Sequence, residues 1–213
     1  MDISAINTSP DEPAEPAGIY VHIPFCRAKC AYCDFASFAG LEAYQAPYLA
    51  ALLCEIEGAA PDWVTVGFDT LFVGGGTPTV MPADGVVRLL LACRQFLGLA
   101  AAAEVSIEAN PGTVSPADLS TLRRAGYNRL SLGVQSLLQE ELALLGRVHD
   151  VAEALDAYHW ARQAGFANVN LDLIYGLPRQ SVAKWRESLL RALELTPEHL
   201  SLYALSVEEG SPL

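Results

Sequence analysis

The sequence is poor in basic residues. Over 213 residues, 13 Lys and Arg stand against 25 Asp and Glu, which gives a formal net charge of −12. A nucleic-acid-binding surface needs cationic side chains opposite the phosphates. We therefore expect no nucleic-acid partner. Hydrophobic residues make up 52% of the chain and charged residues 18%. This composition is typical of a globular protein, and the length suffices for one large domain or two small ones.

Long uncharged apolar runs are also missing. The most apolar stretch, residues 86–103, is interrupted by Arg88 and Arg94, so we expect no transmembrane segment. The N-terminus shows no basic segment followed by an apolar one, which predicts no signal peptide and a cytoplasmic location. Thiols stay reduced in that compartment. The five cysteines therefore predict metal ligands, nucleophiles or core residues rather than disulfides.

The chain alternates short β-like runs with helical patterns, which predicts an α/β fold. Residues 1–18 combine prolines with acidic side chains and predict a disordered lead-in. The expected strands cover residues 19–23, 70–73, 104–108, 129–134, 168–174 and 200–205. The expected helices cover residues 44–57, 82–97, 116–125, 139–145, 151–164 and 182–195.

An internal similarity supports repeated βα units. Residues 124–133 resemble residues 163–172, because each segment has a helix end, a glycine, an aromatic residue and then a strand. Repeated units of this kind indicate parallel strands with helices outside. Six of them predict a partial TIM-like (β/α)6 barrel over residues 19–213.

Polar residues recur on one side of the expected strands. In residues 168–174, alternation turns Val169, Leu171 and Leu173 toward the helices, and Asn170 and Asp172 inward. So many polar groups would be costly in a dry core. The barrel interior is therefore expected to hold a ligand or solvent near the C-terminal strand ends. The same alternation turns inward Tyr20, His22, Ser106, Glu108, Ser131, Gly133 and Gln135.

Three cysteines follow the first expected strand in a C-x3-C-x2-C run, namely Cys26, Cys30 and Cys33. A structural zinc site normally takes four protein ligands, and the fourth would have to be His22 or Asp34. A [4Fe–4S] cluster with three protein thiolates leaves one iron free to bind the amino and carboxylate groups of a small molecule. The spacing favours the cluster over zinc, and over three cysteines buried in the core.

The segment from Tyr20 to Phe35 resembles the radical S-adenosylmethionine (SAM) superfamily, and within it the family of oxygen-independent coproporphyrinogen III oxidases and HemW-type heme chaperones. The resemblance extends from Tyr20 to the last residue. It implies a radical SAM barrel with a [4Fe–4S] cluster on Cys26, Cys30 and Cys33. A reductant would donate an electron to this cluster, which then cleaves SAM to a 5′-deoxyadenosyl radical.

A glycine run, Gly74-Gly75-Gly76-Thr77, follows the second expected strand. Consecutive glycines let the backbone approach a ligand closely, although a plain turn would also explain them. The resemblance implies that Gly75, Gly76 and Thr77 hold the SAM amino group. It also implies SAM contacts from Tyr20 beside the cluster, from Glu108 and Gln135, from Arg147 at the SAM carboxylate, and from Asp172 at the ribose hydroxyls.

Other residues have weaker signals. Alone, Arg147 would be a surface arginine and Glu108 a partner in a helix-side salt bridge. His149 follows Arg147 closely, and its role is left open. Cys54 and Cys93 fall on apolar helix faces, which predicts core positions.

Three functions are compatible with these residues. The first is a HemW-type heme chaperone that binds a cluster, SAM and heme and delivers heme to client proteins. The alternative is a coproporphyrinogen III oxidase-like enzyme of porphyrin biosynthesis, and the third is a non-catalytic metal-binding fragment. Coproporphyrinogen oxidases carry a further Cys where this chain has Phe35, whereas HemW-type chains read Cys-Asp-Phe. Phe35 therefore favours the chaperone. Family members continue into a C-terminal domain, which is expected to be absent here.

Overall fold

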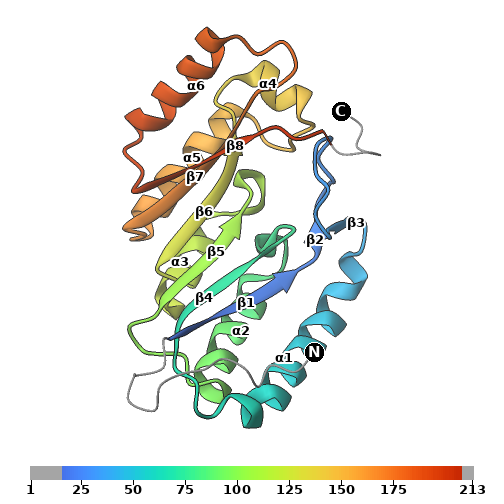
Figure 1. Ribbon diagram of the computed structural model, residues 1–213, viewed down its shortest axis with the longest axis vertical. Coiled ribbons are helices and arrows are strands. Elements are labelled where there is room, and N and C mark those ends of the chain that lie inside the picture. The colour runs from blue at the N-terminus through green and yellow to red at the C-terminus, as the bar shows by residue number, and fades with distance from the viewer. Residues whose placement is uncertain (1–15, 208–213) are drawn as a thin grey trace, which may run out of the picture.

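The computed structural model describes residues 16–207, and its centre is one six-stranded sheet (Figure 1). All neighbouring strands run parallel, in the order β1-β4-β5-β6-β7-β8. The strands are β1 (Ala17–Ile23), β4 (Phe68–Gly75), β5 (Glu104–Ala109), β6 (Arg129–Gln135), β7 (Asn168–Tyr175) and β8 (His199–Ala204). Each matches an expected strand, with bounds that differ by a few residues.

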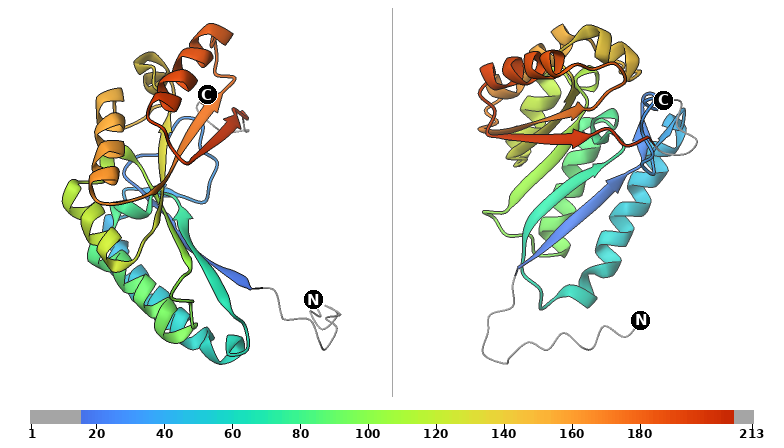
Figure 2. Two further views of the ribbon diagram at one scale, coloured as in Figure 1. Left: turned by 90° about the vertical axis from the view of Figure 1, so that its left-hand side faces the viewer. Right: turned by 45° about the horizontal axis from the view of Figure 1, so that its top comes forward.

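Helices follow the strands and cover one face of the sheet (Figure 2). They are α1 (Gln45–Ala59), α2 (Ala83–Phe96), α3 (Pro116–Ala125), α4 (Gln139–Leu144), α5 (Val151–Gln163) and α6 (Val182–Glu194). Short 3₁₀ turns cover Glu42–Tyr44, Ala60–Trp63, Pro78–Val80 and Pro111–Thr113. This arrangement of a curved parallel sheet with outer helices confirms the predicted α/β, partial (β/α)6 barrel.

Local signals in the sequence explain why the helices begin and end where they do. Ser115 caps α3 in a capping box with Asp118, and Asp150 caps α5 in the same way with Glu153. Gly126 follows α3 with a φ of 117°, a left-handed conformation that glycine adopts at little cost.

The hydrophobic core lies between the helices and the outer face of the sheet. Val105, Ile107, Val169, Leu171 and Leu173 are fully buried there, as strand alternation predicts. The inner face of the sheet carries the inward-facing polar residues of the strands. The candidate site is therefore expected on this face. None of the helices in the described part of the chain has the length and apolarity that a membrane span requires.

Three expectations need correction or qualification. The first strand begins at Ala17, so residues 17–18 belong to the sheet rather than to a disordered lead-in, and residues 1–15 lie outside the described part. The sequence pattern does not predict the two-stranded pair of β2 (Phe25–Cys26) with β3 (Phe38–Ala39). Cys93 is buried as expected, but Cys54 is exposed. Cys54 lies two residues before the buried Ile56, which places it on nearly the opposite side of α1.

Candidate functional site

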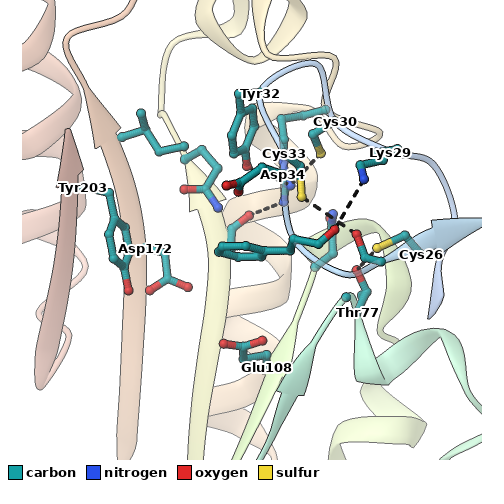
Figure 3. Close-up of a pocket in the computed structure, with 18 of the residues that line it drawn as sticks. Cys26, Lys29, Cys30, Tyr32, Cys33, Asp34, Thr77, Glu108, Asp172 and Tyr203 are labelled. Carbon is teal, nitrogen blue, oxygen red and sulfur yellow. Dashed lines mark hydrogen bonds between the residues drawn. The ribbon is translucent and has the colours of Figure 1, made fainter. Parts of the chain in front are cut away.

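A cavity of about 420 Å³ lies at the C-terminal ends of the strands, between the cysteine loop and the inner face of the sheet (Figure 3). It is lined by all but one of the residues predicted from the sequence. These are Cys26, Cys30, Cys33, Gly75, Gly76, Thr77, Glu108, Gln135, Arg147 and Asp172. Segments from both halves of the chain therefore meet at one place, as the barrel topology requires.

Tyr20 is the predicted residue that does not line the cavity. Its side chain is exposed, its ring stacks on Phe72, and its hydroxyl lies 3.0 Å from His22 Nδ1. His22 Nε2 lies 2.9 Å from the carbonyl oxygen of Ala36, at the end of the cysteine loop. Tyr20 thus supports the histidine that holds this loop, and its contact with SAM stays a prediction.

The three cysteines of the loop face the cavity from different positions. Cys26 Sγ lies 3.6 Å from Thr77 Oγ1, and Cys33 Sγ lies 3.8 Å from Ser37 Oγ. Cys30 Sγ accepts a hydrogen bond from Arg147 at 3.2 Å. All three are half-buried and line the cavity, so they are not core residues.

The glycine run packs against the start of the cysteine loop. The amides of Gly76 and Thr77 donate to the carbonyl oxygens of Ile23 and Phe25, at 2.8 and 2.7 Å. The amide of Gly75 donates to Glu108 Oε2 at 3.0 Å. Because these three N–H groups are used within the protein, the backbone of residues 75–77 can offer a ligand only carbonyl acceptors and space. An amino group is a donor, so this is the chemistry that it needs.

Arg147 is a half-buried residue that ties the cysteine loop to the barrel, not a surface arginine. One guanidinium nitrogen donates to Cys30 Sγ and, at 3.4 Å, to the hydroxyl of Tyr32, and the other donates to the carbonyl oxygen of Gly133 at 2.5 Å. Its Nε is buried and has no hydrogen-bond partner within residues 16–207.

His149, whose role the sequence leaves open, fixes the loop that carries Arg147. It is buried, with Nε2 2.9 Å from the carbonyl oxygen of Val134 and Nδ1 2.9 Å from Asn110 Oδ1. Burial, followed by the charge of Arg147, lowers the pKa of His149 to about 4. The imidazole therefore joins the ends of β5 and β6 to the α4–α5 loop through its two ring nitrogens.

Gln135 is held in an unusual conformation at the end of β6. Its φ is 66°, and the register between β6 and β7 shifts at this point. Its Oε1 is buried and has no hydrogen-bond partner in the described part of the chain. A non-glycine residue in the left-handed region is uncommon and costs free energy. A strained, unpaired acceptor on a cavity wall is the arrangement expected of a ligand contact.

Two carboxylates occupy the inner face below the cysteine loop (Figure 3). Asp172 accepts hydrogen bonds from Ser131 at 3.1 Å and from Asn170 at 2.7 Å. Burial raises the pKa of Asp172, while these hydrogen bonds lower it in part. Burial also raises the pKa of Glu108 to about 7, with a smaller upward contribution from Asp172.

The cavity lining also includes residues that are not among the predicted site residues, and Lys29, Tyr32, Asn110 and Tyr203 are the ones with long polar or aromatic polar side chains or an amide. For Tyr203 the sequence does contain a signal. Strand alternation in residues 200–205 places it on the same face as Ser201, whose partner on β7 is the inward-facing Asp172. Asn110 follows the inward-facing Ser106 and Glu108 with the same alternation. Tyr32 cannot be found this way, because it lies in a loop whose path depends on tertiary contacts.

The comparison with protein families decides the superfamily. Residues 20–192 match the model of the radical SAM superfamily. The chain belongs to the radical SAM superfamily. Membership implies a [4Fe–4S] cluster and SAM as cofactors, and it identifies the cavity as the place to test for them.

Relatives and solved structures agree with this membership. The chain is 42% identical over 206 residues to a Mycobacterium tuberculosis protein named heme chaperone HemW, covering 94% of this chain and 52% of that protein. It is 42% identical to the Escherichia coli protein of the same name, covering 92% and 52%. The structure matches E. coli coproporphyrinogen III oxidase (HemN), described as a radical SAM enzyme, with a TM-score of 0.84 and 34% identity over 92% of this chain and 48% of that one. The chain thus spans about half the length of the proteins it matches.

The residues present fit the two cofactors of a radical SAM protein. Three thiols from one loop line the cavity, and two buried polar atoms on its walls, Gln135 Oε1 and Arg147 Nε, lack partners among the described residues. In residues 16–207, no three His, Cys, Asp or Glu side chains converge closely enough to hold a metal ion, so the spacing of these side chains does not distinguish zinc from a cluster. Both ring nitrogens of His22 have partners. Zinc on the cysteines plus His22 is therefore a poorer fit than a thiolate-bound cluster.

We expect Asp172→Ala to weaken SAM binding by about 1–3 kcal/mol, the usual cost of leaving buried hydrogen-bonding groups unpaired. The reason is that the carboxylate would accept the ribose hydroxyls while Ser131 and Asn170 hold it in place. Isothermal titration of SAM into the reconstituted protein measures the change. Asp156→Ala, at an exposed position of α5, is the matched control. Equal SAM affinity in Asp172→Ala and wild type would contradict the assignment.

The pKa of Glu108 predicts a pH-dependent stability of the ligand-free protein. A carboxyl group with a folded-state pKa near 7 and an ordinary value of 4.5 binds more protons in the folded state between those pH values. The stabilisation of the folded state by this protonated carboxyl group is fully present below pH 4.5 and is lost as the pH rises through 7. The loss in the free energy of unfolding is about 3 kcal/mol in all. Glu108→Gln removes this loss, so the variant should gain stability relative to wild type between pH 5 and pH 8.

Chemical denaturation of both proteins at the two pH values tests this. His149 acts in the opposite direction, because its lowered pKa makes stability increase from about pH 4 to its ordinary value of 6.5. The wild-type-minus-variant difference cancels that contribution. A difference that does not change with pH would show that the Glu108 carboxyl titrates normally.

Proposed function

We propose that this chain is the radical SAM portion of a HemW-type heme chaperone, which binds a [4Fe–4S] cluster, SAM and heme and delivers heme to client proteins. The observation that carries the proposal is the 42% identity, over more than nine-tenths of the chain, to proteins named heme chaperone HemW. The clients and the electron donor belong to the proposal, as does the expected cytoplasmic location.

Phe35 supports the same function. The resemblance to coproporphyrinogen oxidases would require a cysteine at this position, directly after Asp34. Phe35 lines the cavity and is 66% exposed. A phenyl ring cannot ligate iron, but it can pack on the flat apolar face of a porphyrin.

The chain's own residues would bind and orient the cofactors. Cys26, Cys30 and Cys33 would hold the cluster, which supplies one-electron reduction of SAM when it is bound. Arg147 donates to Cys30 and would either keep this bond or turn its guanidinium toward the SAM carboxylate. Asp172 would accept the ribose hydroxyls.

A coproporphyrinogen III oxidase-like enzyme is the second candidate. The structural match to HemN, at 34% identity and a TM-score of 0.84, favours it. In that case a deoxyadenosyl radical would abstract hydrogen from a propionate side chain.

Two assays on the anaerobically reconstituted protein separate these functions. In the first, the protein is titrated with heme and then mixed with an apo heme protein. In the second, it is incubated with SAM, a reductant and coproporphyrinogen. We expect heme binding and transfer without decarboxylated product. Product above one equivalent per chain would contradict the chaperone proposal, because it requires turnover.

A further inference from the structure

Glu141 is a buried carboxylate that the proposed function does not use. It lies in the first turn of α4, is 4% exposed and is not part of the cavity lining. Burying a carboxylate costs free energy unless its oxygens accept hydrogen bonds. Each oxygen of Glu141 accepts one, and the two bonds lead to two different loops, at the C-terminal ends of β6 and β7.

One oxygen of Glu141 ends a chain of hydrogen bonds from the β6–α4 loop. The amide of Leu137 donates to Ser188 Oγ on α6 at 2.8 Å, and Ser188 Oγ lies 3.3 Å from Ser136 Oγ. Ser136 Oγ donates to Glu141 Oε2 at 2.5 Å. Because the Ser136 hydrogen is used in this bond, the Ser188 hydroxyl donates to Ser136. The three donors therefore point in one direction and end on the carboxylate.

The other oxygen of Glu141 ends a second chain, from the β7–α6 loop. The amide of Gly176 donates to Gln180 Oε1 at 2.8 Å, and Gln180 Nε2 donates to Glu141 Oε1 at 3.1 Å. The carboxylate thus joins α4 to the loop before α6, and the two helices lie side by side (Figure 1). Both chains bring a donor to Glu141. A carboxylate accepts on both oxygens, whereas an amide accepts on only one.

The first chain constrains Gln135, which is a SAM contact in the proposed function. Gln135 directly precedes Ser136 and has the left-handed φ of 66°. A strained residue of this kind persists only where the surrounding structure fixes its backbone. Strand β6 fixes the backbone before Gln135. The hydrogen bonds of Ser136 and Leu137 fix it afterwards, and their chain ends on Glu141.

Glu141 also holds the segment that leads to Arg147. The amide of Leu145 donates to the carbonyl oxygen of Glu141 at 3.0 Å, and the amide of Arg147 donates to that of Leu142 at 3.0 Å. One short helical segment therefore connects the carboxylate to the guanidinium. Gln135 Oε1 and Arg147 Nε are buried cavity atoms without a partner in residues 16–207, and Glu141 lies in the stretch of chain between them.

We propose that Glu141 is a positioning residue for SAM binding, which holds Gln135 and Arg147 in the arrangement that SAM contacts. The carboxylate itself touches neither SAM nor the cluster. This inference rests on the proposed function, because it takes from it the SAM contacts of these two residues. It adds to the site a buried residue outside the cavity lining.

The test exchanges acceptor and donor between Glu141 and Gln180. Glu141→Gln places an amide where both neighbours donate, so one donor loses its acceptor. Gln180→Glu places two carboxylates against each other. In the double variant Glu141→Gln/Gln180→Glu, the amide at position 141 donates to the carboxylate at position 180, which still accepts from Gly176. Glu140→Gln is the matched control, because Glu140 is the exposed neighbour and pairs with Lys184 at 2.6 Å.

SAM affinity and iron content are measured in the reconstituted proteins by isothermal titration and iron assay. The electron paramagnetic resonance spectrum of the reduced cluster, recorded with and without SAM, gives a spectroscopic readout. We expect each single variant to bind SAM about tenfold more weakly and to need correspondingly more SAM for the same spectral change, with wild-type iron content. The double variant should regain most of the affinity, and Glu140→Gln should behave like wild type.

Thermal unfolding of the same variants separates positioning from folding. Lower stability with wild-type SAM affinity in Glu141→Gln would overturn the proposal, as would a double variant without rescue, or loss of iron together with SAM. If Glu141→Gln does not fold, Gln180→Glu and the double variant decide the outcome, since Gln180 is only half-buried.

The wild-type protein separates this proposal from the proposed function. A wild-type protein that binds SAM but transfers no heme would contradict the chaperone and leave the role of Glu141 standing. A wild-type protein that binds no SAM would overturn the role of Glu141 together with the cofactors of the proposed function.

Discussion

Cys30→Ala is expected to remove essentially all cluster iron from the reconstituted protein, which should otherwise hold about four iron and four sulfide per chain. The cluster would need all three thiolates of the loop, and the described chain has no spare cysteine at the cavity. Cys54 is exposed on α1 and Cys93 is buried on α2, and neither lines the cavity. Iron and sulfide assays, with the visible absorbance of the cluster, measure the loss.

Cys54→Ala is the matched control, since it removes an accessible thiol without touching the cavity. It should keep the full iron content. Cys26→Ala and Cys33→Ala should behave like Cys30→Ala. If Cys54→Ala lost as much iron as Cys30→Ala, the ligand set would be wrong.

Strand alternation predicts much of the barrel side of the site. It places Glu108 and Asp172 on the inner face, and the cavity confirms their position. It places Gln135 there too, although the register shift at the end of β6 has no signal in the sequence. Alternation works here because parallel strands of a barrel have one face against the helices and one face inward, so a single parity decides each residue's side.

Contacts between residues far apart in the chain, and strand pairs of only a few residues, cannot be predicted from local sequence patterns. Arg147 donates to Cys30, which lies 117 residues earlier in the chain, and nothing in local pattern pairs them. The β2–β3 pair has only two residues in each strand, too few for a periodic signal. The core prediction for Cys54 is wrong because α1 is apolar on several sides, and periodicity then does not identify which side is buried. These features depend on tertiary packing, which overrides local preference.

Gly76→Ala is the second substitution for which we expect a large effect. The structure gives a different physical reason for this effect than the sequence does. From the sequence, the glycine run leaves room for SAM. In the structure, a Cβ on Gly76 would lie 2.6 Å from the carbonyl oxygen of Phe25 and 3.0 Å from Cys26 Sγ. Both atoms belong to the start of the cysteine loop, and one of them is backbone that cannot rotate away. The glycine is therefore required for the loop to pack against the sheet.

The two explanations differ in what Gly76→Ala removes. If the residue only made room for SAM, the variant would keep its cluster iron and lose SAM affinity. If it seats the cysteine loop, iron content and SAM affinity should fall together. Overpacking of this kind costs about 1–3 kcal/mol, which corresponds to about tenfold or more in binding.

Gly67→Ala is the matched control, because a Cβ there meets no atom within 4 Å. We expect Gly67→Ala to retain both cofactors and Gly76→Ala to lose both. A Gly76→Ala protein with full iron content and normal SAM affinity would show that the loop tolerates the displacement.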